Sequence, residues 1–157
     1  MYDETRFWIA QEVADTKYMH DAQSLFHKGK EAMNKKPSTM ITDGLRSYHD
    51  AFNKEFYTNT KPRTEHINTI RMSENMNNNK MERSNGEVRD REKVMRGLKI
   101  KDTFILTGYQ IYHNYIRQHQ ALENKTPAEV SGIKIEGENK WLTLIQNSKH
   151  QIYKKET

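Results

Sequence analysis

The sequence predicts a mixed α/β fold, on two observations. Some segments have a strand-like composition, and others have apolar residues that recur at three- and four-residue steps, as in helices. The two kinds of segment alternate along the chain, which is typical of α/β domains. The composition adds that the core is modest, because 34% of the 157 residues are hydrophobic and 30% are charged. Aromatic residues make up 10% of the chain, which argues against disorder, and the length fits one domain.

The elements follow from local pattern. Aromatic and branched residues predict a first strand, and apolar spacing followed by Pro37 predicts a helix that ends before that proline. In order, we expect a strand at Arg6–Ala14, a helix at Lys17–Asn34, a strand at Ser38–Thr42, a helix at Leu45–Phe56, a short strand at Glu65–Arg71, and helices at Asn79–Gly97 and Thr103–Gln120. The sheet is thin for this much helix, and the chain opens directly in strand-like sequence. We therefore expect that the first strands of the sheet are missing.

Basic charge is concentrated in one segment. The chain has a formal net charge of +5, and the stretch from Lys80 to Lys101 holds eight Lys or Arg against four Asp or Glu, a net of +4. Clustered basic charge favours a polyanionic partner such as nucleic acid. The interleaved acidic residues weaken this signal, because a solvated helix face has the same composition.

Other classes are excluded by what the sequence lacks. No apolar run approaches the roughly 20 residues of a membrane span, and MYDETRFWIA has no basic segment followed by an apolar one, so it is no signal peptide. The absence of cysteine excludes disulfides, thiolate catalysis and cysteine-ligated zinc. It fits a reducing compartment, and we expect a cytoplasmic protein.

Two carboxylates are candidates for a metal site. Asp43 directly follows a predicted strand, where functional groups gather in open α/β sheets, and Mg²⁺ prefers oxygen ligands. The alternative is that Asp43-Gly44 is only a turn. Glu82 lies on a predicted helix with Asn78 and Asn79 one turn before it and Arg89 two turns after it, and a solvated face explains these residues as well. His66, on the predicted strand between the two carboxylates, can approach the same site.

Three motifs carry a resemblance to a known family. TDGLRSY, then NNNKMER with REKVMRGLK, then NYIRQHQALENKTPAEV stand in the order found in DDE-type transposases of prokaryotic insertion sequences. The resemblance runs from about Thr5 to Ile133, and its most specific part is the closing signature, here Asn114, Arg117, His119, Leu122, Thr126, Pro127 and Glu129. Gln118 stands where the family often has proline. Residues 1–133 are therefore interpreted as a partial DDE catalytic domain and 134–157 as a short polar tail.

The resemblance implies a fold and an activity. The fold is RNase H-like, a mixed sheet with flanking helices, and the activity is metal-dependent DNA strand cleavage and transfer in transposition and integration. Asp43 and Glu82 would be the second and third of three catalytic carboxylates and would bind two Mg²⁺ ions. DNA contacts are expected at Asn78, Asn79, Arg89, Lys93 and Arg96.

The first carboxylate is the point where this chain departs from the family pattern. Asp3 in MYDET resembles the first-aspartate motif, but Thr5–Ala10 is similar to the third strand of the family fold, which places Asp3 in the turn before it. We therefore expect an N-terminally truncated, inactive fragment. The alternative is a non-catalytic DNA-binding or regulatory remnant. Expected partners are the ends of the insertion sequence, target DNA, and a second copy or an intact transposase.

Overall fold

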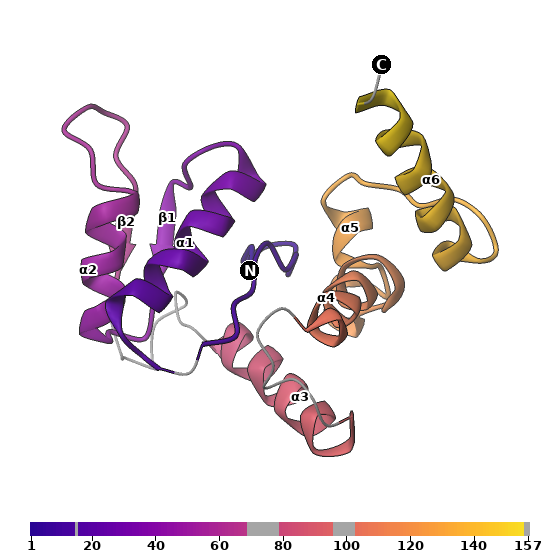
Figure 1. Cartoon of the computed structure of the whole chain (residues 1–157), viewed down its shortest axis with the longest axis horizontal. Coiled ribbons are helices and arrows are strands. Elements are labelled where there is room, and N and C mark those ends of the chain that lie inside the picture. The colour runs from indigo at the N-terminus through magenta and orange to yellow at the C-terminus, as the bar shows by residue number, and fades with distance from the viewer. Residues whose placement is uncertain (15, 69–78, 96–102, 156–157) are drawn as a thin grey trace. The chain divides into compact units, whose positions relative to one another are not determined.

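The computed structural model describes residues 1–14, 16–68, 79–95 and 103–155. The chain forms two compact units: Ile9–Thr103 with Met1, and Tyr2–Trp8 with Phe104–Thr157. Six α-helices and a two-stranded parallel sheet make up the regular structure of the described residues, together with a π-helix and a 3₁₀ turn (Figure 1). The mixed α/β prediction is confirmed.

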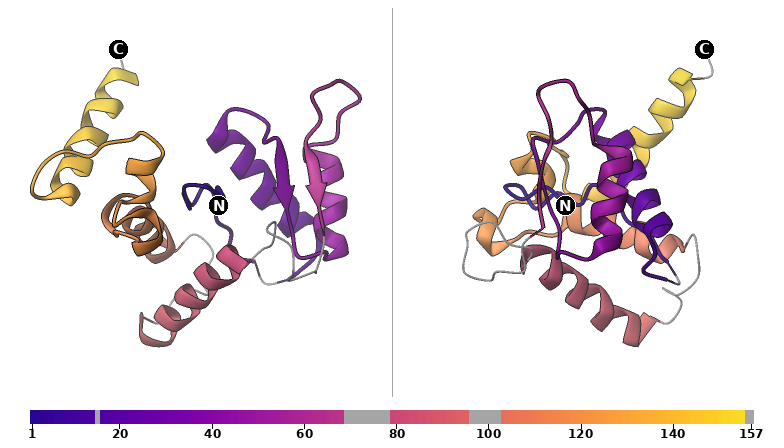
Figure 2. Two further views of the ribbon diagram at one scale, coloured as in Figure 1. Left: turned by 180° about the vertical axis from the view of Figure 1, so that it is seen from behind. Right: turned by 90° about the vertical axis from the view of Figure 1, so that its left-hand side faces the viewer.

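The first unit is built on a β–α–β arrangement preceded by a helix. Its elements are α1 (Met19–Met33), β1 (Thr39–Ile41), α2 (Arg46–Glu55), β2 (Glu65–Ile67) and α3 (Asn79–Met95). Strand β1 pairs with β2 in parallel, with Met40 opposite His66. Figure 2 shows α1 and α2 side by side next to the two strands. The predicted helices and strands from Lys17 onward in this unit are confirmed, although β2 is shorter than expected and the expected residues 69–71 and 96–97 lie outside the described part.

Aromatic rings make the core of the first unit. Phe26 of α1 lies 5.9 Å from Tyr48 and 6.1 Å from Phe56, measured between ring centroids, and Phe52 stacks on Phe56 at 5.9 Å. Ala51 and Phe56 are almost completely buried. The buried residues between Tyr48 and Phe56 recur at three- and four-residue steps along α2 and its C-terminal end, so one helix face buries them together. Helix α1 ends where Asn34 adopts a left-handed conformation at φ 51°, a usual helix C-terminus.

The strand predicted at Arg6–Ala14 was wrong. These residues form no strand, and Arg6 has φ 57°, which an extended strand does not allow. The backbone of Trp8 is bonded instead by side chains of the second unit, from Gln110 and Asn114. A composition suited to a strand was therefore not sufficient, because side-chain amides take the place of a neighbouring strand.

The second unit is helical. Helix α4 (Phe104–Ile111) passes directly into the π-helix η1 (Tyr112–Ile116), followed by η2 (Gln120–Leu122), α5 (Pro127–Val130) and α6 (Lys140–Lys155). The predicted helix at Thr103–Gln120 therefore ends four residues early, because Arg117 donates its backbone N–H to Tyr112 over 2.8 Å and then turns into extended backbone. The sequence also missed α6, which lies in the segment interpreted as a polar tail. Trp8, Leu106 and Ala128 form the apolar core of this unit.

Candidate active site

Asp43 lies at the carboxyl end of β1. The strand pairing continues one residue beyond β1, since Thr42 donates its N–H to the carbonyl of Ile67 over 2.9 Å. Asp43 follows, exposed to solvent, and its Oδ1 accepts a hydrogen bond from the N–H of Leu45 at 3.2 Å. Gly44 provides the turn with φ 82°. This bond uses one of the two carboxylate oxygens, so the turn role and a ligand role are compatible at this residue.

His66 is packed directly beside this strand end. Its Nε2 is 3.0 Å from Oγ1 of Thr42, and its ring stacks on Phe52 at 4.3 Å between centroids. The ring of His49 lies on it as well, at 5.8 Å. Burial, and then the charge of His49, lower the pKa of His66, which keeps the imidazole neutral near pH 7. His66 thus contacts Thr42, the residue next to Asp43, and its approach to the site stays a prediction.

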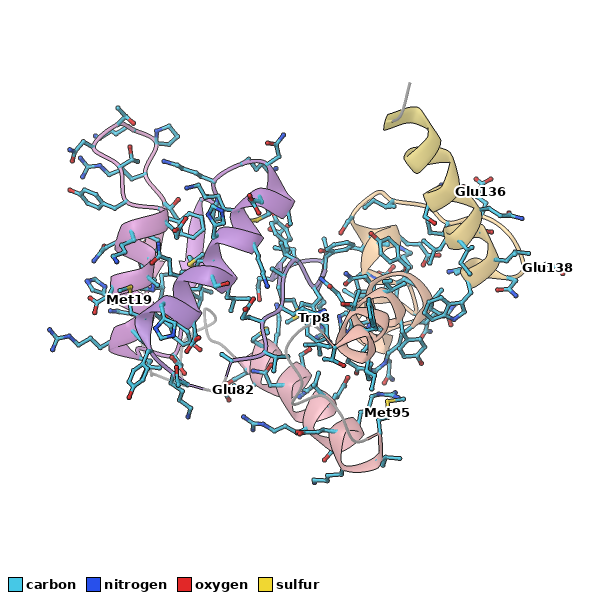
Figure 3. The ribbon with its side chains drawn as sticks, viewed as in Figure 1. Trp8, Met19, Glu82, Met95, Glu136 and Glu138 are labelled. Carbon is cyan, nitrogen blue, oxygen red and sulfur yellow. The ribbon has the colours of Figure 1, made fainter. Side chains whose placement is uncertain are left out.

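Glu82 lies in the first turn of α3, on an exposed face. Asn79, Glu82, Arg89 and Lys93 are spaced by three, seven and four residues. At about 100° per residue they fall within roughly 80° around the helix axis, so they form one stripe. Lys93 also donates to Oδ1 of Asp90 over 3.1 Å, an exposed contact that leaves the ammonium accessible. In Figure 3, Glu82 marks the start of this helix and Met95 its end.

The opposite side of α3 is the buried one. Ser84 is 7% exposed, and Met81 and Val88, on the same side of the helix, are half-buried. The centre of this face lies roughly 150° around the axis from the stripe that carries Glu82. The sequence therefore separates a packing face from a polar face, and Glu82 points away from the packing face.

The predicted site residues fall into two groups. Asp43 is grouped with Thr42 and His66 at the strand end, and the stripe on α3 groups Asn79, Glu82, Arg89 and Lys93. Residues 69–78 connect the two groups and lie outside the described part, as do the candidates Asn78 and Arg96. Among the residues that the structure describes, no three His, Asp or Glu side chains lie close enough together to hold a metal ion.

The closing signature has a structural role. Asn114 is 2% exposed and bonds the backbone of Trp8, while Thr126 and Glu129 form a reciprocal cap on α5. In this cap Thr126 Oγ1 accepts from the N–H of Glu129 at 3.2 Å, and Glu129 Oε2 accepts from the N–H of Thr126 at 2.8 Å. The spacing of a threonine and a glutamate three residues apart signals such a capping box and was the available clue.

The comparison with protein families identifies the class. A family model described as a DDE domain matches residues 3–119, which is most of the chain. The protein belongs to the family of DDE-type transposase domains of insertion sequences. Neither the curated proteins nor the solved structures gave a match. Within the described residues, no helix is both long enough and apolar enough to span a membrane.

Proposed function

We propose that this chain is a DNA strand-transfer domain whose active site combines Asp43 and Glu82. The proposal is supported by the family and by the position of Asp43 at the carboxyl end of β1, which is where α/β sheets gather functional groups. Such a site combines carboxylates from separate elements, and this chain offers one at a strand end and one on an exposed helix stripe. The fold proposed for the whole domain is RNase H-like.

The donor set fits a hard divalent cation. Asp43 is exposed and bonds the backbone of Leu45 through one oxygen only, and Glu82 is exposed on α3. Carboxylate oxygens of this kind are the protein ligands that Mg²⁺ takes, with water and phosphate completing its shell. When bound, such ions supply an activated water or 3′-hydroxyl and a positive charge beside the leaving oxygen. Asp43 and Glu82 would hold the ions.

The remaining stripe residues are proposed to hold DNA. The guanidinium of Arg89 can bond a phosphate through two parallel N–H groups, and Lys93 adds a positive charge one turn further on. Asn79 offers an amide donor on the other side of Glu82, and we assign Asn78 and Arg96 to the same surface. These groups would place the phosphate backbone along α3 with the carboxylate of Glu82 beside it.

Asp3 is not assigned to the site. It lies in a turn over residues 3–5, and the N–H of Tyr2 bonds the carbonyl of Phe7 across this turn at 2.8 Å. This position supports its interpretation as a turn residue before the segment that contains Trp8. With two of three carboxylates, the chain is proposed to bind metal weakly and to turn over little or no substrate.

Manganese binding and DNA nicking test the proposal together. Electron paramagnetic resonance of added Mn²⁺ is expected to show weak binding, which falls by about tenfold or more in Asp43→Asn and in Glu82→Gln. Asp50→Asn, an exposed carboxylate on α2, is the matched control and keeps the wild-type affinity. Equal affinity in all four proteins would exclude Asp43 and Glu82 as ligands.

The nicking assay addresses the role of Asp3. With Mg²⁺ or Mn²⁺ and a supercoiled plasmid, we expect no product above the level of the Asp43→Asn variant. Robust nicking or strand transfer that Asp3→Ala abolishes would falsify the assignment of Asp3 to a turn, since Asp3 would then complete the site.

A second candidate function is a non-catalytic DNA-binding or regulatory protein. It is favoured by the exposed basic stripe on α3, which needs no metal to bind phosphates. DNA binding by the Glu82→Gln variant, together with manganese binding by the wild type, distinguishes the two functions. Unchanged DNA binding in the presence and absence of Mg²⁺, together with no manganese affinity in the wild type, would favour the non-catalytic protein.

A further inference from the structure

Two surface connections meet at the amino end of the parallel strands. Thr64 Oγ1 donates to the carbonyl of Pro37 at 2.7 Å, and the N–H of Glu65 donates to the carbonyl of Ser38 at 2.8 Å. These bonds join the α1–β1 connection, residues 34–38, to the α2–β2 connection, residues 56–64. Both views in Figure 2 show the two connections at the same end of the strands.

Four basic side chains are displayed on these joined connections. Lys35 and Lys36 stand on the first, Lys61 and Arg63 on the second, and all four are exposed. We call them the basic edge cluster. The guanidinium of Arg63 donates to the carbonyl of Asn59 at 3.2 Å, and none of the four forms an ion pair with a described carboxylate.

Other lysines of the same unit are used differently. Lys28 pairs with Glu12, and Lys30 pairs with Glu55 at 3.7 Å. Those pairs attach α1 to its neighbours and neutralise the charge. The basic edge cluster has no such partner, so its positive charge remains available to a ligand in solution.

The cluster lies at the opposite end of β1 from Asp43. Asp43 comes four residues after Thr39, where the strand begins, and at about 3.3 Å per residue the separation is roughly 13 Å. At this distance, the side chains of the basic edge cluster do not reach a DNA phosphate that is held beside Asp43. A ligand bound there makes a contact that is separate from the candidate active site.

We propose that the basic edge cluster binds the phosphate backbone of duplex DNA as a second contact, away from the segment held beside Asp43. This inference rests on the proposed function. The neighbouring side chains fit a phosphate ligand, because Asn59 offers an amide and the hydroxyls of Thr58 and Thr60, which bond each other at 2.8 Å, keep one hydroxyl proton to donate. The amide nitrogen of Asn59 is a free donor for this purpose, since Tyr57 bonds its oxygen at 3.2 Å.

The salt dependence of DNA binding tests this contact. Each phosphate neutralised contributes about −0.9 to the slope of log K against log salt concentration, so four contacts contribute about −3.6. We expect the variant K35Q/K36Q/K61Q/R63Q, measured with a duplex of mixed sequence by fluorescence anisotropy, to lose between about two and four units of slope. The charge-conserving variant K35R/K36R/K61R/R63K keeps the wild-type slope.

The outcomes separate this inference from the proposed function. If Arg89→Gln lowers the slope by about one unit and the fourfold Gln variant does not lower it, the second contact is excluded while DNA binding along α3 stands. If neither variant changes the slope, both the second contact and the contact along α3 are excluded. Far-ultraviolet circular dichroism of each variant confirms that the exposed substitutions leave the fold intact. An acidic peptide that binds the basic edge cluster more tightly than duplex DNA does would also overturn the proposal.

Discussion

The side chain of Asn114 bonds both backbone groups of Trp8. The N–H of Trp8 donates to Oδ1 at 2.8 Å, and Nδ2 donates to the carbonyl of Trp8 at 3.0 Å. Both residues are buried, at 2% and 4% exposure, so water does not replace these bonds. One amide thus provides for Trp8 what a neighbouring strand would provide, and it fixes the segment Tyr2–Trp8 to the π-helix.

The first prediction concerns Asn114→Ala. The substitution removes the Oδ1 that accepts from the buried N–H of Trp8, whereas the carbonyl keeps the bond from Gln110 at 2.7 Å. A buried unsatisfied group costs about 1–3 kcal/mol, so we expect a loss of about 2 kcal/mol in the free energy of unfolding. Urea denaturation followed by tryptophan fluorescence measures it. Asn147→Ala, on an exposed position of α6, is the control and changes stability by less than about 0.5 kcal/mol. Equal effects of the two substitutions would contradict the anchoring role.

The second prediction concerns the titration of His66. Burial, followed by the charge of His49, lowers its pKa below the ordinary value of 6.5. The folded protein therefore binds this proton less readily than the unfolded chain. The stabilisation is fully present above pH 6.5 and is lost as the pH falls through 6.5 toward the lower pKa of the folded state. NMR titration of the ring protons, assigned by the signal lost in His66→Gln, is expected to show a midpoint below 6.5.

A matched substitution at His49 separates the two causes. His49→Phe keeps a ring stacked on His66 and removes the charge, so the pKa of His66 rises. It stays below 6.5, because burial is the larger cause and persists. A midpoint at or above 6.5 in the wild type would show that His66 is not packed against Thr42 as described.

The third prediction concerns the cap of α5. Thr126 is 1% exposed, and its hydroxyl oxygen accepts from the N–H of Glu129. Thr126→Ala removes that acceptor, and we expect a loss of about 1–2 kcal/mol in the free energy of unfolding. Thr126→Ser keeps the oxygen and is the control, with a smaller loss from the missing methyl group. A stability of Thr126→Ala equal to that of Thr126→Ser would mean that the cap contributes nothing.

The capping box also sets the charge of Glu129. Its hydrogen bond with Lys140, at 2.8 Å, is the largest cause of a lowered pKa, and the backbone N–H of Thr126 adds to it. The stabilisation from a lowered carboxyl pKa is present above about pH 4.5 and is lost as the pH falls toward the folded value. Because the pair is about a quarter exposed on each side, its own contribution to stability is small.

Local pattern predicted most elements of the first unit. Helices α1 and α2 have regular apolar spacing, α3 has a run of good helix formers after Gly86, and β1 and β2 are short strands bounded by turn or polar residues, so local pattern was sufficient there. The failures share a cause. At Trp8 the hydrogen-bond partner is a side chain 106 residues away, and at Tyr112–Ile116 the helix adopts a wider turn that brings His113 and Asn114 into the core. Neither tertiary effect can be derived from local spacing.

The candidate site was predicted in part for the same reason. Asp43 could be placed because it directly follows a strand, and the stripe on α3 because helical spacing fixes it. The contact between His66 and Thr42 depends on the pairing register of β1 and β2, which the sequence alone did not give. Helix α6 was missed although Asn139 caps it, with Oδ1 accepting from the N–H of Leu142 at 3.2 Å.

The last prediction tests the polarity of α3. Arg89 lies on the stripe with Glu82, whereas Arg91 lies near the buried face, roughly 160° away around the axis. If DNA lies along the stripe, Arg89→Gln removes one phosphate contact and lowers the salt slope of DNA binding by about one unit. Arg91→Gln carries the same change of charge on the same helix and leaves the slope nearly unchanged. Fluorescence anisotropy at several salt concentrations measures both. A similar reduction in the two variants would show that α3 contributes only its net charge, and that Glu82 stands on an ordinary solvated face.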